Sequence, residues 1–263
     1  MTVRGRGITA ARRVARDLLK RWGVQRASDI EVEKIATAMG IVIVTGPLKG
    51  SRGRLKADAS PVIRIADTTV DPGARRFTIA HELGHLLLGH PCHHPKSVKR
   101  AERRDDERHY EDEANAFATE LLMPRALVAL RCQHAMPSLD LAREIATDFR
   151  TSLVSTTLRV VELTTSPCAV VYSERGSIHW AHKTYRFPHL ARIRGPLPPD
   201  VAADLVVAND ERPRRVTASR WIDTSLAAEL QEHTARVPET GGAITMLSFE
   251  PAIAKALRTA NAT

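Results

Sequence analysis

The sequence contains no long apolar run and few cysteines. No apolar stretch reaches the roughly 18 uninterrupted residues that a membrane-spanning helix needs, so we expect no membrane segment. The first residues, Met1 to Arg6, lead into a charged helix rather than the apolar core of a signal peptide. The cysteines, Cys92, Cys132 and Cys168, are scattered and odd in number, which is typical of a reducing compartment. We therefore expect a cytoplasmic protein.

Positive charge is in excess, because 39 lysines and arginines oppose 30 acidic residues and give a net charge of +9. A basic surface permits contact with nucleic acid or with acidic protein surfaces. We prefer to interpret the positive net charge as that of an ordinary solvated surface in a proteome that favours arginine. The length of 263 residues allows two or three small domains, and a hydrophobic content of 43% supports a buried core.

The most informative segment is 77–88, which contains an H-E-x-x-H pentad at 81–85. The segment is apolar nearly all round, which predicts a buried helix. His81 and His85 lie one turn apart on one face, so both imidazoles can bind one Zn²⁺. Glu82 lies about 100° from His81 and can act as general base on a metal-bound water without binding the metal. Burying these groups without partners costs several kcal/mol, which favours a metal site over hydrogen-bonded histidines.

A catalytic zinc site usually has a third protein ligand. One motif extends the pentad to H-E-x-x-H-x-x-G-x-x-H. That motif is excluded, because Leu88 and Pro91 occupy the positions of its glycine and last histidine, and His90 lies one residue too early.

A second amphipathic helix, which ends near Pro124, supplies a better candidate for the third ligand. On its helical wheel Glu111 lies about 60° from the centre of the apolar face, whereas Glu113 lies about 100° away. We therefore expect Glu111 to point toward the core and bind the metal. Asn115, one turn further on, is expected to orient a metal-binding histidine. Glu113 as ligand, or an ordinary acidic first turn, remain the alternatives. The apolar face is formed by Ala114, Phe117, Ala118, Leu121 and Leu122.

These two segments resemble the ImmA/IrrE family of metallo-endopeptidases. The family pattern R-F-T-x-A-H-E-x-G-H is matched at 76–85, and E-x-x-A-N-x-F-A-x-x-L-L-M-P at 111–124, without departures in the motif positions. The resemblance implies that both pentad histidines and Glu111 bind zinc and that Glu82 is the catalytic base. It also implies a protein substrate, namely a helix-turn-helix transcriptional repressor. Such a repressor would be cleaved, or its repression relieved, in stress responses or in control of mobile elements.

The segment before the pentad predicts a small sheet beside the metal helix, with Asp29 as N-cap of one of two earlier helices. An edge strand at Arg54–Lys56 is our candidate for binding an extended substrate. Residues 96–109 are expected to form a mobile loop or a solvated helix end. The metal helix should begin near Pro72. The other expected elements are helices at about 8–22 and 29–39 and strands at 41–44, 53–56 and 62–65.

Downstream, two apolar helical faces at 139–149 and 153–163 are joined by the short segment 150–152, which predicts a helix-turn-helix-like pair. The second helix offers only Arg159 as an obvious group for reading bases, so DNA binding is possible but not favoured. IrrE-type members also carry such a segment, followed by a GAF-type sensor domain. The resemblance thus implies a GAF-like fold here, with an unknown ligand.

From Ser166 on the sequence predicts an α+β domain. A hairpin is expected around Glu174-Arg175-Gly176, with further strands near 215–218 and 243–247 and helices near 200–207 and 251–257. Four histidines of this region are interpreted as surface residues, and Cys92-His93-His94 as a solvated loop rather than a second metal site. The four histidines are His179, His182, His189 and His233.

The complete prediction is an α+β protein with a zincin-like peptidase domain at 1–127, a helix-turn-helix-like segment at 128–165 and an α+β domain at 166–263 that is a candidate for a sensory role. The predicted function is that of a zinc endopeptidase. The alternative is a non-proteolytic regulatory module with a structural metal site, which binds DNA or a repressor.

Overall fold

The computed structural model describes residues 3–91, 100–202, 212–223, 228–238, 240–250 and 253. The chain divides into two compact units. Unit 1 comprises Met1–Leu127 with Thr147–Ser152, and unit 2 comprises Val128–Ala146 with Leu153–Thr263. Helices and two sheets make the fold α+β, as predicted. The three-part domain division stays a prediction. No helix among the described residues is long and apolar enough to cross a membrane.

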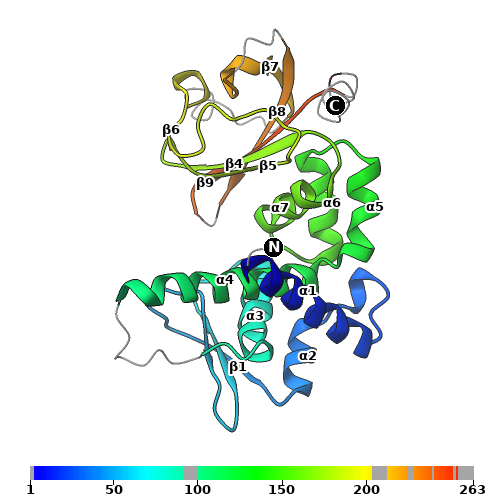
Figure 1. Ribbon diagram of the computed structural model, residues 1–263, viewed down its shortest axis with the longest axis vertical. Coiled ribbons are helices and arrows are strands. Elements are labelled where there is room, and N and C mark those ends of the chain that lie inside the picture. Colours follow the sequence, from blue (N-terminus) through cyan, green and yellow to red (C-terminus); the bar gives the residue numbers. More distant parts are fainter. Residues whose placement is uncertain are drawn as a thin grey trace. The chain divides into compact units, whose positions relative to one another are not determined.

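Unit 1 combines a helical layer with a small sheet (Figure 1). Helix α1 lies along α4, and α4 also packs against α3. The core is formed by side chains such as Ile79, Leu83, Ile63 and Phe117, all fully buried. The elements are α1 (Val3–Arg21), η1 (Ala27–Asp29), α2 (Val32–Ala38), β1 (Val42–Gly46), β2 (Gly53–Lys56), β3 (Val62–Ala66), α3 (Pro72–Leu87) and α4 (Arg100–Leu122).

The sheet of unit 1 has the order β1-β3-β2, with β1 parallel and β2 antiparallel to β3. Its alternating pattern buries Leu55, Ile63 and Ile65 and leaves Arg54 and Arg64 exposed, as expected for a sheet with one solvated face. The predicted strand at 53–56 is confirmed, and it lies at an edge of the sheet. It contacts α3, so an edge strand runs beside the helix that carries the pentad.

Helix α3 begins where the sequence predicts. The side chain of Asp71 accepts a hydrogen bond from the backbone N–H of Ala74, and Pro72 occupies the first helical position. Two other predictions in unit 1 need correction. Asp29 does not cap α2, because it closes the turn η1 and accepts hydrogen bonds from the N–H groups of Gln25 and Arg26. For residues 96–109 a loop or a helix end was expected: residues 100–109 form the first part of α4, so the helix-end alternative holds there and the loop does not, while 92–99, with the Cys92 segment, lie outside the described residues.

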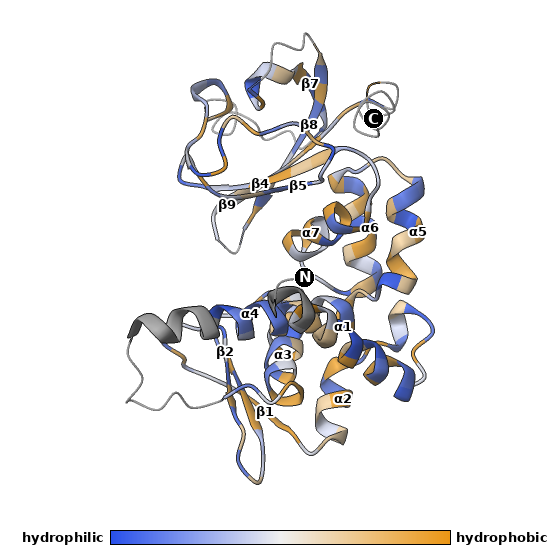
Figure 2. Ribbon diagram, viewed as in Figure 1, coloured by the Kyte–Doolittle hydropathy of each residue, from blue (hydrophilic) through white to orange (hydrophobic). Residues whose placement is uncertain are grey.

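In unit 2 the predicted helical pair is present as α6 (Leu139–Phe149) and α7 (Leu153–Leu163), preceded by α5 (Arg125–His134). Figure 2 shows hydrophobic stretches on both α6 and α7. Most residues of α7 beyond its first turn are buried, its first three residues and Leu158 are half-buried, and Glu162 is its one exposed residue. Arg159 is 1% exposed and forms an ion pair with Glu162 at 2.8 Å. The expectation that α7 presents Arg159 to a partner is therefore wrong.

The six-stranded sheet of unit 2 has the order β6-β5-β4-β9-β8-β7, with antiparallel neighbours. The predicted hairpin is confirmed, because Arg175 and Gly176 both have the positive φ that a tight turn between β4 and β5 requires. Its strands are β4 (Cys168–Glu174), β5 (Ser177–Lys183), β6 (Gly195–Pro196), β7 (Arg214–Thr217), β8 (Glu229–Val237) and β9 (Gly242–Ser248), with the turn η2 (Ala218–Arg220).

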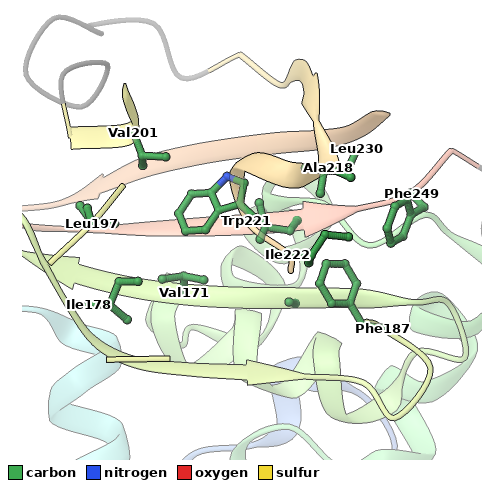
Figure 3. Close-up of a cluster of buried hydrophobic side chains, with 12 residues drawn as sticks. Val171, Ile178, Phe187, Leu197, Val201, Ala218, Trp221, Ile222, Leu230 and Phe249 are labelled. Atoms are coloured by element: carbon green, nitrogen blue, oxygen red, sulfur yellow. The ribbon is translucent and has the colours of Figure 1, made fainter. Parts of the chain in front are cut away.

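A hydrophobic cluster packs on this sheet (Figure 3). Trp221 lies over the strands, and the rings of Phe187 and Phe249 are 5.3 Å apart. Strand β8 was not predicted, because charged residues interrupt its apolar pattern. Its Glu232 is 2% exposed and is neutralised by Arg214 at 3.1 Å and by Arg220 at 3.2 Å.

Some predictions for unit 2 are corrected or fall outside the described residues. His233 is buried on β8 and is not a surface residue, whereas His179, His182 and His189 are exposed. Residues 199–202 are helical, and the rest of the helix expected near 200–207 lies outside the described residues. The helix expected at 251–257 also lies outside them, except for residue 253.

Candidate metal centre

Two helices bring the predicted site residues together, and a glycine lets them approach closely. A Cβ atom at Gly84 of α3 would lie 3.0 Å from Cδ1 of Phe117 and 3.3 Å from Cα of Ala114, both on α4. Such contacts are tighter than ordinary packing, so glycine permits this approach of the two helices. Glu111 lies three residues before Ala114 and therefore faces the pentad. The contact between α3 and α4 thus carries a carboxylate to the histidines.

The three predicted ligands form one cluster in which each offers a single donor atom. Nε2 of His81 lies 3.0 Å from Nε2 of His85, and the oxygens of Glu111 lie 3.3 Å and 3.4 Å from these two nitrogens. Zinc binds nitrogen and carboxylate oxygen at about 2.0–2.2 Å in a tetrahedron, whose edges are then about 3.3 Å long. The donor atoms therefore have the types and the separations that zinc requires, and the residues fit the metal.

Glu111 reaches the cluster from the solvent side. Its side chain is 58% exposed, so the expectation that Glu111 points into the core is wrong, although it is the acidic residue that meets the histidines. Hydrogen bonds from His81 and His85 hold the pKa of this carboxyl group well below its usual range. Burial opposes the charged form of His81, but the hydrogen bond and charge of Glu111 outweigh burial and raise the pKa of the ring. This mutual stabilisation shows the electrostatic preference of the cluster for a cation.

Asn115 holds the ring of His81. Nδ1 of His81 lies 3.0 Å from the amide oxygen of Asn115. An amide oxygen can only accept a hydrogen bond, so the ring donates from Nδ1 and its Nε2 lone pair faces the cluster. This contact fixes both the tautomer and the orientation of the His81 ring, as a residue that supports a metal-binding histidine would.

His90 holds the ring of His85, and this residue was missed by the sequence reasoning. Nδ1 of His90 lies 3.0 Å from Nδ1 of His85, and its Nε2 lies 3.0 Å from Glu113. Burial lowers the pKa of His90, while Glu113 acts in the opposite direction. A usable signal was present in the sequence, because a glycine just after a helix places the next residue beside the last turn. In the structure this glycine, Gly89, has the left-handed φ of +69° that such a turn requires.

Glu82 lies beside the donor cluster, between α3 and the edge strand. It is 8% exposed, and its carboxylate accepts a hydrogen bond from the backbone N–H of Leu55 on β2. A Cβ atom at Gly53 would lie 2.7 Å from Oε1 of Glu82, so the strand passes this closely only because residue 53 is glycine. Burial raises the pKa of Glu82, although His81 and His85 lower it. A carboxylate with a raised pKa is suited to accept a proton near neutral pH.

Comparisons with known proteins agree with this construction. Residues 36–160 match the family model Peptidase_M78, the IrrE N-terminal-like domain. The matched span is a little under half of the chain and contains β1 to α4 and both motif segments. The resemblance to the ImmA/IrrE family that the motifs predicted is thereby confirmed.

A solved structure described as a Mycobacterium tuberculosis transcriptional regulator has a similar fold, with a TM-score of 0.61. The two sequences are 17% identical, and the alignment covers 96% of this chain and 79% of that chain. At this identity the likeness shows a common fold over nearly the whole chain. No curated protein matches the sequence.

Proposed function

We propose that the protein is a zinc-dependent endopeptidase, with His81, His85 and Glu111 as zinc ligands and Glu82 as the catalytic base. The observation that carries this proposal is the set of three donor atoms separated by 3.0–3.4 Å, with a buried carboxylate beside them. We also propose a zincin-like architecture, which is supported by the position of the proposed ligands on two helices with an edge strand alongside.

Zinc held at this site would act as a Lewis acid on a peptide carbonyl and would make water a stronger nucleophile. Glu82 takes a proton from the attacking water and then donates it to the leaving amine. The hydrogen bond from Leu55 keeps the carboxylate of Glu82 directed along the strand. Asn115 keeps Nε2 of His81 available as a donor atom.

The proposed substrate is a protein segment in extended conformation that adds to the free edge of β2. Strand addition uses main-chain hydrogen bonds and therefore suits an unfolded or flexible segment. Following the family resemblance, we propose a helix-turn-helix transcriptional repressor as substrate, in stress response or in control of mobile elements. The fold likeness to a transcriptional regulator supports a regulatory role. Unit 2 is proposed to be a GAF-like sensory domain, and the site of action to be the cytoplasm.

The experiment that tests the proposal incubates the zinc-loaded protein with the helix-turn-helix repressor encoded nearest its gene and measures intact masses. We expect the wild type to cut the repressor and Glu82→Gln to bind zinc without cutting. Glu31→Gln, at the half-buried N-cap residue of α2 that pairs with Lys34, is the matched control and should cut normally. A Glu82→Gln variant as active as the wild type would refute the proposed base. Binding of the repressor without cleavage by the zinc-loaded wild type would favour the regulatory-module alternative.

A further inference from the structure

We propose that His90 and Glu113 are positioning residues of the metal site, which together fix the tautomer and the orientation of His85. The proposal rests on the zinc peptidase function. It assigns a role to His90, which lies outside the motif at 76–85, and to Glu113, which the sequence offered only as an alternative metal ligand. His90 contacts His85 at Nδ1, on the side of the ring away from the donor nitrogen Nε2, and Glu113 contacts His90, so both act through His85.

The backbone at the end of α3 places His90 over His85. Gly89 has a φ of +69°, its N–H donates to the carbonyl of Leu86, and the N–H of His90 donates to the carbonyl of His85 at 3.0 Å. These two bonds form a Schellman motif, in which the second residue beyond the helix contacts the residue five positions earlier. Usually that contact is hydrophobic. Here it joins two imidazole rings whose centroids are 5.0 Å apart.

The carboxylate of Glu113 sets the direction of each hydrogen bond in the series that runs from Glu113 through His90 to His85. A carboxylate can only accept, so Glu113 takes the Nε2–H of His90 at 3.0 Å. The neutral ring of His90 then has only a lone pair at Nδ1, which accepts from Nδ1–H of His85 at 3.0 Å. This leaves Nε2 of His85 as a lone pair, directed at Nε2 of His81 and at Glu111. The carboxylate thereby selects the metal-binding tautomer through two rings.

The surroundings keep this chain in one arrangement. The side chain of His90 is 4% exposed, and the ring of Tyr110 packs against it with centroids 4.6 Å apart. Glu113 lies against α1 at Gly7, where a Cβ atom would collide with the carboxylate. The packing of α1 on α4 therefore leaves room for Glu113 only because residue 7 is glycine.

The two histidine ligands are thus supported differently. His81 donates to a neutral amide of Asn115, whereas His85 donates to a ring that is backed by a carboxylate. A carboxylate behind a metal-binding histidine raises the basicity of the ligand, and loss of such support costs about 10–100-fold in metal affinity. We expect losses in this range when His90 or Glu113 is removed.

The test measures zinc affinity by competition with a chromogenic chelator, with the full chain and no substrate. His90→Leu and Glu113→Leu should weaken zinc binding by about 10–100-fold. His90→Gln is the rescue variant, because its amide oxygen can accept from His85 and its NH₂ group can donate to Glu113, and it should bind within a few-fold of the wild type. Tyr110→Leu removes the packing partner of His90 but neither hydrogen bond, and it should bind zinc normally.

A second readout is independent of affinity. Long-range ¹H–¹⁵N spectra of the histidine rings report which nitrogen carries the proton, and the zinc-loaded wild type should show His85 protonated at Nδ1. In metal-free protein, His90→Leu should lose this single tautomer, whereas Tyr110→Leu should keep it. If His90→Leu fails to fold, Gly7→Ala serves instead, because its added methyl group displaces the carboxylate of Glu113 while His90, Glu113 and His85 themselves are all retained.

The possible outcomes separate this inference from the proposed function. Unchanged zinc affinity in both leucine variants, or equal losses in His90→Gln and His90→Leu, would overturn the positioning role while leaving the peptidase intact. A wild-type protein that binds no zinc would overturn both proposals. Weakened binding with rescue by glutamine, and a lost tautomer only where the hydrogen bonds are removed, would establish the role.

Discussion

Replacement of Gly53 by alanine should separate the proposed base from the metal site. The backbone at Gly53 accepts alanine without strain, because its φ is not positive. The added methyl group would collide with the side-chain methyl of Thr78 and would lie 2.7 Å from Oε1 of Glu82. None of the proposed zinc ligands is among the atoms that it meets. The substitution therefore acts on Thr78 and on Glu82, and we expect the donor cluster to stay unchanged.

The size of the effect follows from the displacement. Non-bonded contacts of carbon have an optimum near 3.5 Å, so the carboxylate of Glu82 must move by roughly 0.8 Å. A misplacement of about 1 Å at a reacting group costs on the order of 10²-fold in rate. We expect kcat to fall by about that factor and the affinity for zinc to stay within about twofold of the wild type.

The assay measures cleavage at saturating substrate together with zinc affinity from chelator competition. Gly46→Ala is the matched control, because this glycine lies in the same sheet and its added methyl meets only the flexible end of Arg64, at 3.1 Å. The control should retain full activity. A Gly53→Ala enzyme with wild-type kcat would refute the placement of Glu82 as base, and a loss of zinc in this variant would refute the separation of base from ligands.

Two further predictions follow from shifted pKa values. Because Glu111 raises the pKa of His81, zinc must displace a proton from this ring. Zinc affinity, measured by chelator competition, should therefore increase with pH by up to about tenfold per unit until His81 is neutral. A zinc affinity that does not change between about pH 5.5 and 7.5 would contradict this. Burial raises the pKa of Cys132 to about 11 and of Cys168 to about 12, so iodoacetamide at pH 8 should label neither thiol in the folded protein and both after denaturation, as peptide mapping would show.

The residues that form the candidate cluster could be found from the sequence because short-range rules bring most of them together. Helical spacing places His81 and His85 on one face, and the motif continues to Glu111 and Asn115. The reason given for Glu111 was wrong, however. The helical wheel measured its angle to the apolar face but not the crossing of α3 and α4, and that crossing brings the histidines to an exposed side of α4.

Long-range contacts explain what the sequence did not reveal. Strand β8 contains Glu232, whose burial is compensated by Arg214 and Arg220 from segments before it in the chain. No local sequence pattern predicts that these arginines will pair with Glu232. His90 was rejected as a ligand by counting, and the same count could have identified it as the residue that a glycine turn returns to the helix.

The segment that suggested a DNA-binding pair has a different structural role. A Cβ atom at Gly73 would collide with the backbone of Thr151 and Ser152, so the turn between α6 and α7 lies directly against the first turn of α3. Arg150, in the same turn, donates a hydrogen bond to the backbone carbonyl of Ile30 at 3.2 Å. A recognition helix must expose a face to the groove, whereas α7 exposes only Glu162 and its candidate base-reading group, Arg159, is buried and paired with its own helix. The turn therefore supports the helix that carries the pentad, and the excess of positive charge elsewhere on the chain is no longer an argument for DNA recognition by this pair.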